Sequence, residues 1–258
     1  GIILPMLPHE NLLPDVNLTP YSIWLATVVV SGISYLSYLL KRYVFHESGT
    51  LVSGIIGGLY SSTATISVLA RKSRKASEQE ATDYVAAMLL AISMMFLRFM
   101  ILILIFSREI FLSIYPYLLT MAVVAAIVAW FIHSRQKRSN DQPVEAEEDD
   151  SSNPLEFKVA LIFAVLFVIF TFLTHYTLVY AGTGGLNLLS FVSGFSDITP
   201  FILNLLQNTG SVAALIITAC SMQAIISNIM VNMFYALFFA GKGSKLRPWI
   251  LGGFGVVI

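Results

Sequence analysis

Charged residues are scarce in this chain. Only 12% of its 258 residues are Asp, Glu, Lys or Arg, whereas 57% are hydrophobic, and soluble domains carry about 25% charged residues. The formal net charge is +0, so the chain lacks the basic surface typical of proteins that bind nucleic acid. Several apolar segments reach the roughly 20 residues that a helix needs to cross a bilayer. We therefore expect an all-α, polytopic membrane helix bundle that contacts membrane lipid and no nucleic acid.

Cysteines and catalytic motifs are also nearly absent. The single cysteine, Cys220, lies in an apolar segment and cannot form a disulfide within the chain. The sequence has no HExxH, no GxSxG, no phosphate-binding glycine loop and no His/Asp cluster at metal-ligand spacing. We expect Cys220 to be a small buried hydrophobic residue, and we expect neither an enzyme nor a bound cofactor.

The apolar segments form two groups of similar order. Each group has a span, a segment interrupted by polar residues and two further apolar segments: 20–40, 49–70, 84–106 and 110–132, then 157–181, 185–207, 210–240 and a last one from Trp249. The stretch between the groups is acidic and has no apolar periodicity, which is typical of a solvated linker. We expect membrane repeat one over 1–138, an acidic cytoplasmic linker over 139–156 and membrane repeat two over 157–258.

Both ends resemble incomplete spans. The opening GIILPMLP resembles the tail of a preceding span, and the final PWILGGFGVVI is too short to cross a bilayer. We therefore expect a membrane domain taken from a longer protein. In the linker, cation binding by the acidic run 147–150 is an alternative to a purely solvated role, but the run lacks the ligand spacing and glycine turn of a calcium loop.

Two stretches combine glycines and hydroxyl residues inside apolar segments. The first is 54–65, GIIGGLYSSTAT, and the second is 193–199, SGFSDIT; residues 58–63 align with residues 194–199. Irregular backbone at membrane depth persists only where protein or a water-filled cavity satisfies it. We predict that these stretches are the tips of two broken segments that face each other in mid-bilayer and form a solute site.

The distribution of Lys and Arg favours re-entrant segments, because cytoplasmic loops carry an excess of these residues. If every apolar segment crosses, the better orientation places eight flanking cations inside and six outside; if 49–70 and 185–207 are both re-entrant, the split becomes 13 to 1. The two repeats then insert in opposite orientation, an arrangement that recurs among transporters. Making only 185–207 re-entrant gives 11 to 3, so an alternative for 49–70 is an ordinary spanning helix with a packing face at Gly54 and Gly58.

The predicted site residues follow from these two stretches. Ser or Thr after the glycine turn can cap the returning half-helix, and Thr199 before Pro200 repeats this pattern. Both returning half-helices would then direct N–H groups and a positive dipole end toward the midplane. Packing of the backbone alone is the alternative role for these hydroxyls. The candidate residues at the tips are Gly58, Ser61, Ser62, Thr63, Thr65, Gly194, Asp197 and Thr199.

Three more polar residues, Arg98, Asn228 and Asn232, complete the candidate set. Arg98 and Asp197 are charges placed inside the membrane, where each costs about 2.5–3.5 kcal/mol unless paired or hydrated. We expect them to approach each other or to face one aqueous cavity; a structural pair, or an Arg98 side chain directed outward, are the alternatives. Asn228 and Asn232 are four residues apart and share one helix face, where they either bond between helices or line a path.

Several segments together resemble a known family. They are GISYLSYLLKR, SGIIGGLYSSTATISVLARKSR, MMFLR, SGFSDITPF and SNIMVN, and they resemble the C-terminal membrane domain of MgtC/SapB-related bacterial proteins, catalogued as domain of unknown function 4010. The resemblance implies a multi-pass protein of the bacterial inner membrane, often preceded by an MgtC-like N-terminal domain in the same chain. It also implies a magnesium-related role. Family members often carry lysine where this chain has Asn232.

The sequence therefore predicts a secondary-transporter-like protein that moves a small ion or solute through a midplane site. The alternative is a non-transporting membrane regulator that binds a partner protein. The identity of the solute, any metal at the site and assembly into a homo-oligomer are left open.

Overall fold

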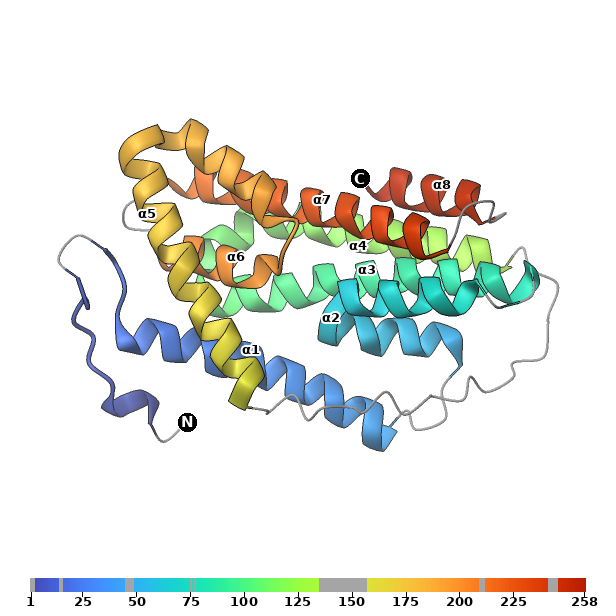
Figure 1. The fold of residues 1–258 in the computed structure, drawn as a ribbon, viewed down its shortest axis with the longest axis horizontal. Coiled ribbons are helices and arrows are strands. Elements are labelled where there is room, and N and C mark those ends of the chain that lie inside the picture. The colour runs from blue at the N-terminus through green and yellow to red at the C-terminus, as the bar shows by residue number, and fades with distance from the viewer. Residues whose placement is uncertain are drawn as a thin grey trace. The chain divides into compact units, whose positions relative to one another are not determined.

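A computed structural model describes residues 3–13, 16–44, 49–74, 76, 78–134, 157–208, 212–240 and 246–258. The predicted acidic linker at 139–156 lies outside these residues. All the regular elements of the described chain are helices, as its composition predicts (Figure 1). Its helices are η1 (Leu4–Met6), α1 (Pro20–Leu39), η2 (Leu40–Val44), α2 (Thr50–Ser73), α3 (Glu78–Phe106), α4 (Arg108–Ser134), α5 (Phe157–Ser193), α6 (Ile198–Gln207), α7 (Ala214–Phe239) and α8 (Arg247–Val257).

Six of the described helices are long and apolar enough to cross a membrane. They are α1, α2, α3, α4, α5 and α7, and many large apolar side chains on them are exposed. Exposed apolar surface on this scale is typical of helices that face lipid rather than water. The chain is therefore a multi-pass, all-helical membrane protein in its general architecture.

The chain divides into two compact units. Unit 1 comprises 1–35, 101–114 and 153–228, and unit 2 comprises 36–100, 115–152 and 229–258. Each unit thus draws residues from both predicted sequence repeats. The division of the chain into repeats at 1–138 and 157–258 stays a prediction.

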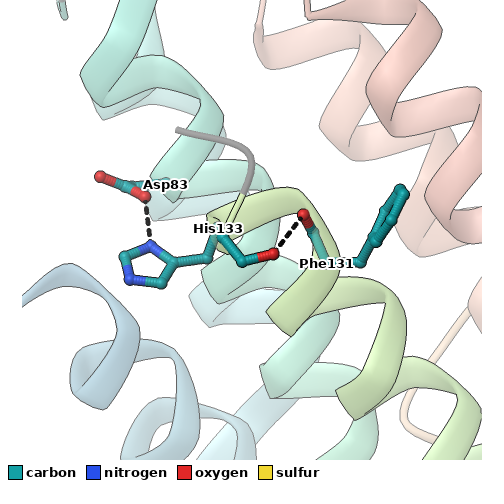
Figure 2. Close-up of polar contacts among 4 residues, drawn as sticks. Asp83, Phe131 and His133 are labelled. Atoms are coloured by element: carbon teal, nitrogen blue, oxygen red, sulfur yellow. Dashed lines mark hydrogen bonds and ion pairs between the residues drawn. The ribbon is translucent and has the colours of Figure 1, made fainter. Parts of the chain in front are cut away.

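Unit 2 is built around the first half of α3. Its residues from Val85 to Leu89 are fully buried, and the many alanines there let neighbouring backbones approach closely. The hydroxyl of Ser93 donates to the carbonyl of Ala122 in α4 at 2.8 Å. Near the C-terminal end of α4, His133 Nδ1 lies 2.8 Å from Asp83 Oδ1 of α3 (Figure 2). These contacts hold α3 and α4 together within unit 2.

Unit 1 is built around α6. This ten-residue helix is buried along its whole length from Ile198 to Leu206, which is expected of a short apolar helix enclosed by longer ones. Phe201 packs on Phe170 of α5, with ring centroids 5.6 Å apart. Asn204 Nδ2 donates to the Thr171 hydroxyl of α5 at 2.7 Å. Cys220 of α7 is buried, as its apolar surroundings in the sequence predict.

Two of the long helices are broken. α2 contains one residue with non-helical backbone angles, Ser61 (φ −158°, ψ 107°), and α5 contains Gly182 (φ 60°, ψ −152°). A positive φ of this kind strongly favours glycine. The breaks divide α2 into limbs 50–60 and 62–73, and α5 into limbs 157–181 and 183–193. The predicted interruption of the segment 49–70 is confirmed, and the predicted boundary between 157–181 and 185–207 coincides with Gly182.

Candidate functional site

The first candidate tip lies where α2 folds back on itself at Ser61. A Cβ placed on Gly57 would contact the side chain of Thr65, with the Thr65 Cγ2 atom 2.8 Å away. Residues eight apart in an unbroken helix lie about 12 Å apart along the axis, so this contact shows that the two limbs of α2 form a hairpin. Figure 1 shows the limbs as two adjacent stretches of ribbon.

Ser61 caps the returning limb of this hairpin. Its backbone is extended, and its hydroxyl accepts a hydrogen bond from the backbone N–H of Ala64 at 3.4 Å. This is the geometry of a serine N-cap, which satisfies one of the unpaired N–H groups at the start of a helix. The capping role predicted for a hydroxyl residue after the glycine turn is confirmed for Ser61.

The glycines of the first limb allow close packing on α3. A Cβ on Gly58 would lie 2.5 Å from the Cα of Ala91, and a Cβ on Gly54 would meet the backbone of Ala87. Only glycine fits at such distances. The packing face expected for Gly54 and Gly58 is therefore present, although it belongs to one limb of a hairpin and not to an unbroken helix.

Arg98 of α3 is directed at the end of the first limb. Its Nη1 atom donates to the carbonyl of Tyr60 at 2.8 Å. Tyr60 is the last residue before the break, where carbonyl groups lack helical partners and carry the negative end of the helix dipole. A guanidinium at this point therefore both donates to an otherwise unpaired carbonyl and opposes the dipole. The orientations expected for Arg98 did not include a bond to a backbone carbonyl of the first tip, and its approach to Asp197 stays a prediction.

The other predicted residues of the first tip are partly used in packing. Ser62 is buried, and its hydroxyl lies 3.2 Å from the sulfur of Met95 in α3. The carbonyl of Thr63 accepts from the Ser67 hydroxyl at 2.8 Å, one turn later. Thr65 lies against Gly57 across the hairpin. Ser61, Thr63 and Thr65 each keep part of their surface accessible.

The second candidate tip joins α5 to α6. The limb 183–193 ends in a turn at 194–196, and α6 then begins with Asp197 as its N-cap. The Asp197 carboxylate accepts a hydrogen bond from the N–H of Thr199 at 2.9 Å. The prediction that Thr199 caps this helix was wrong, because Thr199 is already its second helical residue. A carboxylate forms a charge-assisted cap and also interacts favourably with the helix dipole.

Neighbouring residues of α7 hold the second tip in place. A Cβ on Gly194 would meet the Ser227 side chain and lie 2.8 Å from the backbone nitrogen of Asn228. The Ser227 hydroxyl donates to the Phe191 carbonyl at 2.7 Å, and Asn228 Nδ2 donates to the Gly194 carbonyl at 3.1 Å. Asn228 therefore bonds between helices, one of its two predicted roles. Asn232 is fully buried in unit 2, and its part in a solute path stays a prediction.

The two tips share the same contact pattern. Ser61 and Asp197, which occupy corresponding positions in the aligned stretches, are both N-caps of a returning limb. Gly58 and Gly194 also correspond, and each approaches a neighbouring helix at a residue the same distance further along the chain, Ala91 and Ser227 respectively. Equal spacing in two separate hairpins is the pattern that an internal repeat produces.

Each tip carries a single type of charge. Arg98 adds a cation at the end of the first limb of α2, whereas Asp197 adds an anion at the start of α6. The two residues belong to different units, so the expectation that they approach each other, or that the tips face each other, stays a prediction. Among the described residues, no group of three or more His, Cys, Asp or Glu side chains is arranged to hold a metal ion.

Two features of the hairpins were not predictable from the sequence. One is the carbonyl of Tyr60 as the partner of Arg98, because a backbone acceptor carries no residue-type signal. The other is a cavity in unit 1 beside Gly182, lined in part by Thr171 and Thr174 of α5. The sequence pattern that could have indicated this cavity is the pair Thr171 and Thr174, one helical turn apart, followed by Gly182 in the same helix.

Comparisons with known proteins complete the description of the site. A family model described as "Domain of unknown function (DUF4010)" matches residues 28–240, which include both tips. The chain is also similar to a protein of Aquifex aeolicus (strain VF5) that is named "Uncharacterized protein", with 26% identity over 205 residues, 78% of this chain and 87% of that protein. No solved structure matches the chain.

Proposed function

Because the chain belongs to the DUF4010 family, whose description assigns no activity, we propose its function from the two hairpins themselves: it is a secondary-transporter-like membrane protein. A small ion or solute contacts the polar tips at Ser61 and Asp197 as it crosses. The observation that carries this proposal is that two short helical hairpins of a multi-pass membrane protein turn at capped polar tips, each with one charged side chain beside it.

The short limbs support re-entrant insertion. Each limb of α2 has about three turns and is roughly 17 Å long, whereas the hydrocarbon core of a bilayer is about 30 Å thick. A hairpin of two such limbs enters and leaves on one side, in agreement with the distribution of Lys and Arg along the chain. The same reasoning applies to the limb 183–193 and α6.

The shared contact pattern supports an inverted repeat. With both hairpins re-entrant, the second repeat is inserted in the opposite orientation to the first, and the tips approach the membrane midplane from opposite faces. Transporters built in this way place broken helices at the midplane and use their ends to coordinate the solute. The location proposed for the protein is the bacterial inner membrane.

Substitution of Asp197 provides the most direct test of the transport proposal, because one variant can remove the charge of this residue and keep its capping hydrogen bond. Asn is as good an N-cap as Asp, so Asp197→Asn keeps the fold of the tip and removes the charge. Reconstituted into proteoliposomes, the wild-type chain is expected to take up at least one labelled solute from a panel of Mg²⁺, K⁺, Na⁺, phosphate, amino acids and sugars. Asp197→Asn is expected to lower that uptake at least tenfold while the midpoint of thermal unfolding stays unchanged.

The controls distinguish transport from a structural role. Asp197→Ala removes both cap and charge and should destabilise the protein by about 1 kcal/mol. Equal uptake by the wild type and by Asp197→Asn for every transported solute would remove Asp197 from the mechanism. Absence of uptake of all solutes by the folded wild type would favour the rival function, a membrane regulator that binds a partner protein.

A further inference from the structure

A cavity in unit 1 lies at the end of the second hairpin opposite its tip. Its volume is about 460 Å³, within the range of small-molecule pockets. Its walls come from the N-terminal segment, from the last turns of the first limb of α5 up to the break at Gly182, and from the residue after α6. Its polar lining residues are Asn17, Thr171, Thr174, His175, Thr183 and Asn208.

The cavity extends along a considerable part of α5. Thr171 and Gly182 both line it, and they are separated by about 16 Å along the helix axis. This is roughly half the thickness of a bilayer core. The first limb of α5 is apolar enough to cross a membrane, so the polar side chains along this cavity need partners in the protein itself, in water or in a polar ligand.

Thr174 has a hydroxyl that lacks a partner among the described residues. The residue is 2% exposed, and its Oγ1 atom forms no hydrogen bond there. The hydroxyl of Thr171, one turn earlier, has the usual partner of a threonine in a helix, because it donates to the Phe167 carbonyl four residues before it at 2.9 Å. A buried hydroxyl without a partner costs about 1–3 kcal/mol, so a polar group bound beside Thr174 would stabilise this wall.

The residue types in the wall indicate the chemical class of that group. Hydroxyls, amides and an imidazole both donate and accept hydrogen bonds, and none of the lining residues that the structure describes is Asp, Glu, Lys or Arg. A ligand with a net charge would lose its hydration there without a compensating charge. A neutral molecule with several hydroxyl groups matches the lining in both donors and acceptors.

We propose that this cavity is a binding site for a neutral polyol, with Thr174 as a hydrogen-bonding residue in its wall. The site is separate from the hairpin tips, and it does not depend on the proposed transport. Gly182 contributes by its backbone conformation, because the break there opens the end of α5 without placing a side chain in the cavity.

Direct binding tests the proposal. Labelled xylitol is titrated onto the purified chain in lipid nanodiscs, with gluconate and glucosamine as charged competitors of similar size. Xylitol is expected to bind saturably, and each charged competitor is expected to displace it at least tenfold less well than unlabelled xylitol does. Thr174→Val, which keeps the shape of the side chain, should weaken binding at least fivefold, and Thr174→Ser should restore most of it.

Matched variants make the outcome decisive. Thr218→Val removes a hydroxyl that bonds within α7 and should bind xylitol as the wild type does, as should Asp197→Asn, which alters only the tip. Any one of three results overturns the proposal. The first is no saturable binding of xylitol to the folded wild type, as expected of a cavity that holds water alone. The second is equal binding of xylitol by Thr174→Val and the wild type, and the third is displacement of xylitol by gluconate or glucosamine as strong as by unlabelled xylitol. Loss of uptake in Asp197→Asn with unchanged xylitol binding would separate this site from the transport proposal.

Discussion

At the scale of single residues, Arg98 shows how a charge that is unfavourable inside a membrane can stabilise the local structure. An arginine in a membrane-spanning helix costs about 2.5–3.5 kcal/mol when it is unpaired. Its hydrogen bond to the Tyr60 carbonyl offsets part of this cost and stabilises the end of the first limb of α2. The contact also fixes the break at Ser61 relative to α3, so Arg98 positions the first tip.

Replacement of Arg98 should therefore loosen this tip. Arg98→Met keeps much of the side-chain volume but removes the donor and the charge, and we expect it to lower the free energy of unfolding by about 1.5–3 kcal/mol, the range for hydrogen bonds that involve charged groups. Arg98→Lys should lose less, because it retains a charged donor. Unfolding of the purified protein in mild detergent, followed by intrinsic fluorescence, measures the difference.

Arg108 supplies the matched control for this prediction. It is an exposed arginine at the start of α4, and Arg108→Met should change stability by no more than about 0.5 kcal/mol. An Arg98→Met variant that is as stable as Arg108→Met would show that the bond to Tyr60 contributes nothing to the fold.

At the scale of elements, the first hairpin depends on the close approach of its glycine face to α3. Gly58→Ala places a Cβ 2.5 Å from the Cα of Ala91, a backbone atom that cannot move without shifting α3. We expect a loss of about 1–3 kcal/mol in stability from this overpacking. Gly32→Ala in α1 meets nothing within 4 Å and should be neutral or slightly stabilising, because alanine favours helices. The fraction of each variant that is recovered folded after heating measures the difference in stability. Equal fractions for Gly58→Ala and Gly32→Ala would contradict the prediction.

The comparison of sequence and structure is also clearest for these elements. Length and hydropathy predicted the spans well, because burial in lipid needs only a run of apolar residues of sufficient length. The break at Ser61 was predictable from the cluster of glycines and hydroxyl residues. The true cap of α6 was not, since Asp197 and Thr199 are both good N-caps and the sequence does not show at which residue the backbone turns. The cavity beside Gly182 depends on three segments distant in the chain, which no local pattern reports.

At the scale of the whole molecule, the corresponding contacts of the two hairpins and the distribution of charge point to the same topology. Gly58 and Gly194 each pack on the following long helix at equal sequence spacing. An internal duplication would account for this equality, and the opposite insertion proposed for its two copies would place nearly all flanking cations on one side. The two arguments are independent, because one uses contacts within each unit and the other uses the sequence alone.

The deciding question is whether α2 enters and leaves the membrane on one side. In a Cys220→Ala background, single cysteines are introduced by Tyr43→Cys before the hairpin, Ala76→Cys after it and Ser107→Cys beyond α3, and intact expressing bacteria are treated with a membrane-impermeant maleimide. If α2 is re-entrant, positions 43 and 76 share the cytoplasmic side and react only after lysis, whereas position 107 reacts in intact cells, because α3 crosses between 76 and 107. If α2 crosses the bilayer, positions 43 and 76 must react under opposite conditions. That result would reverse the inserted orientation of every segment before α2 relative to those after it, and the inverted repeat would no longer account for the placement of the cations.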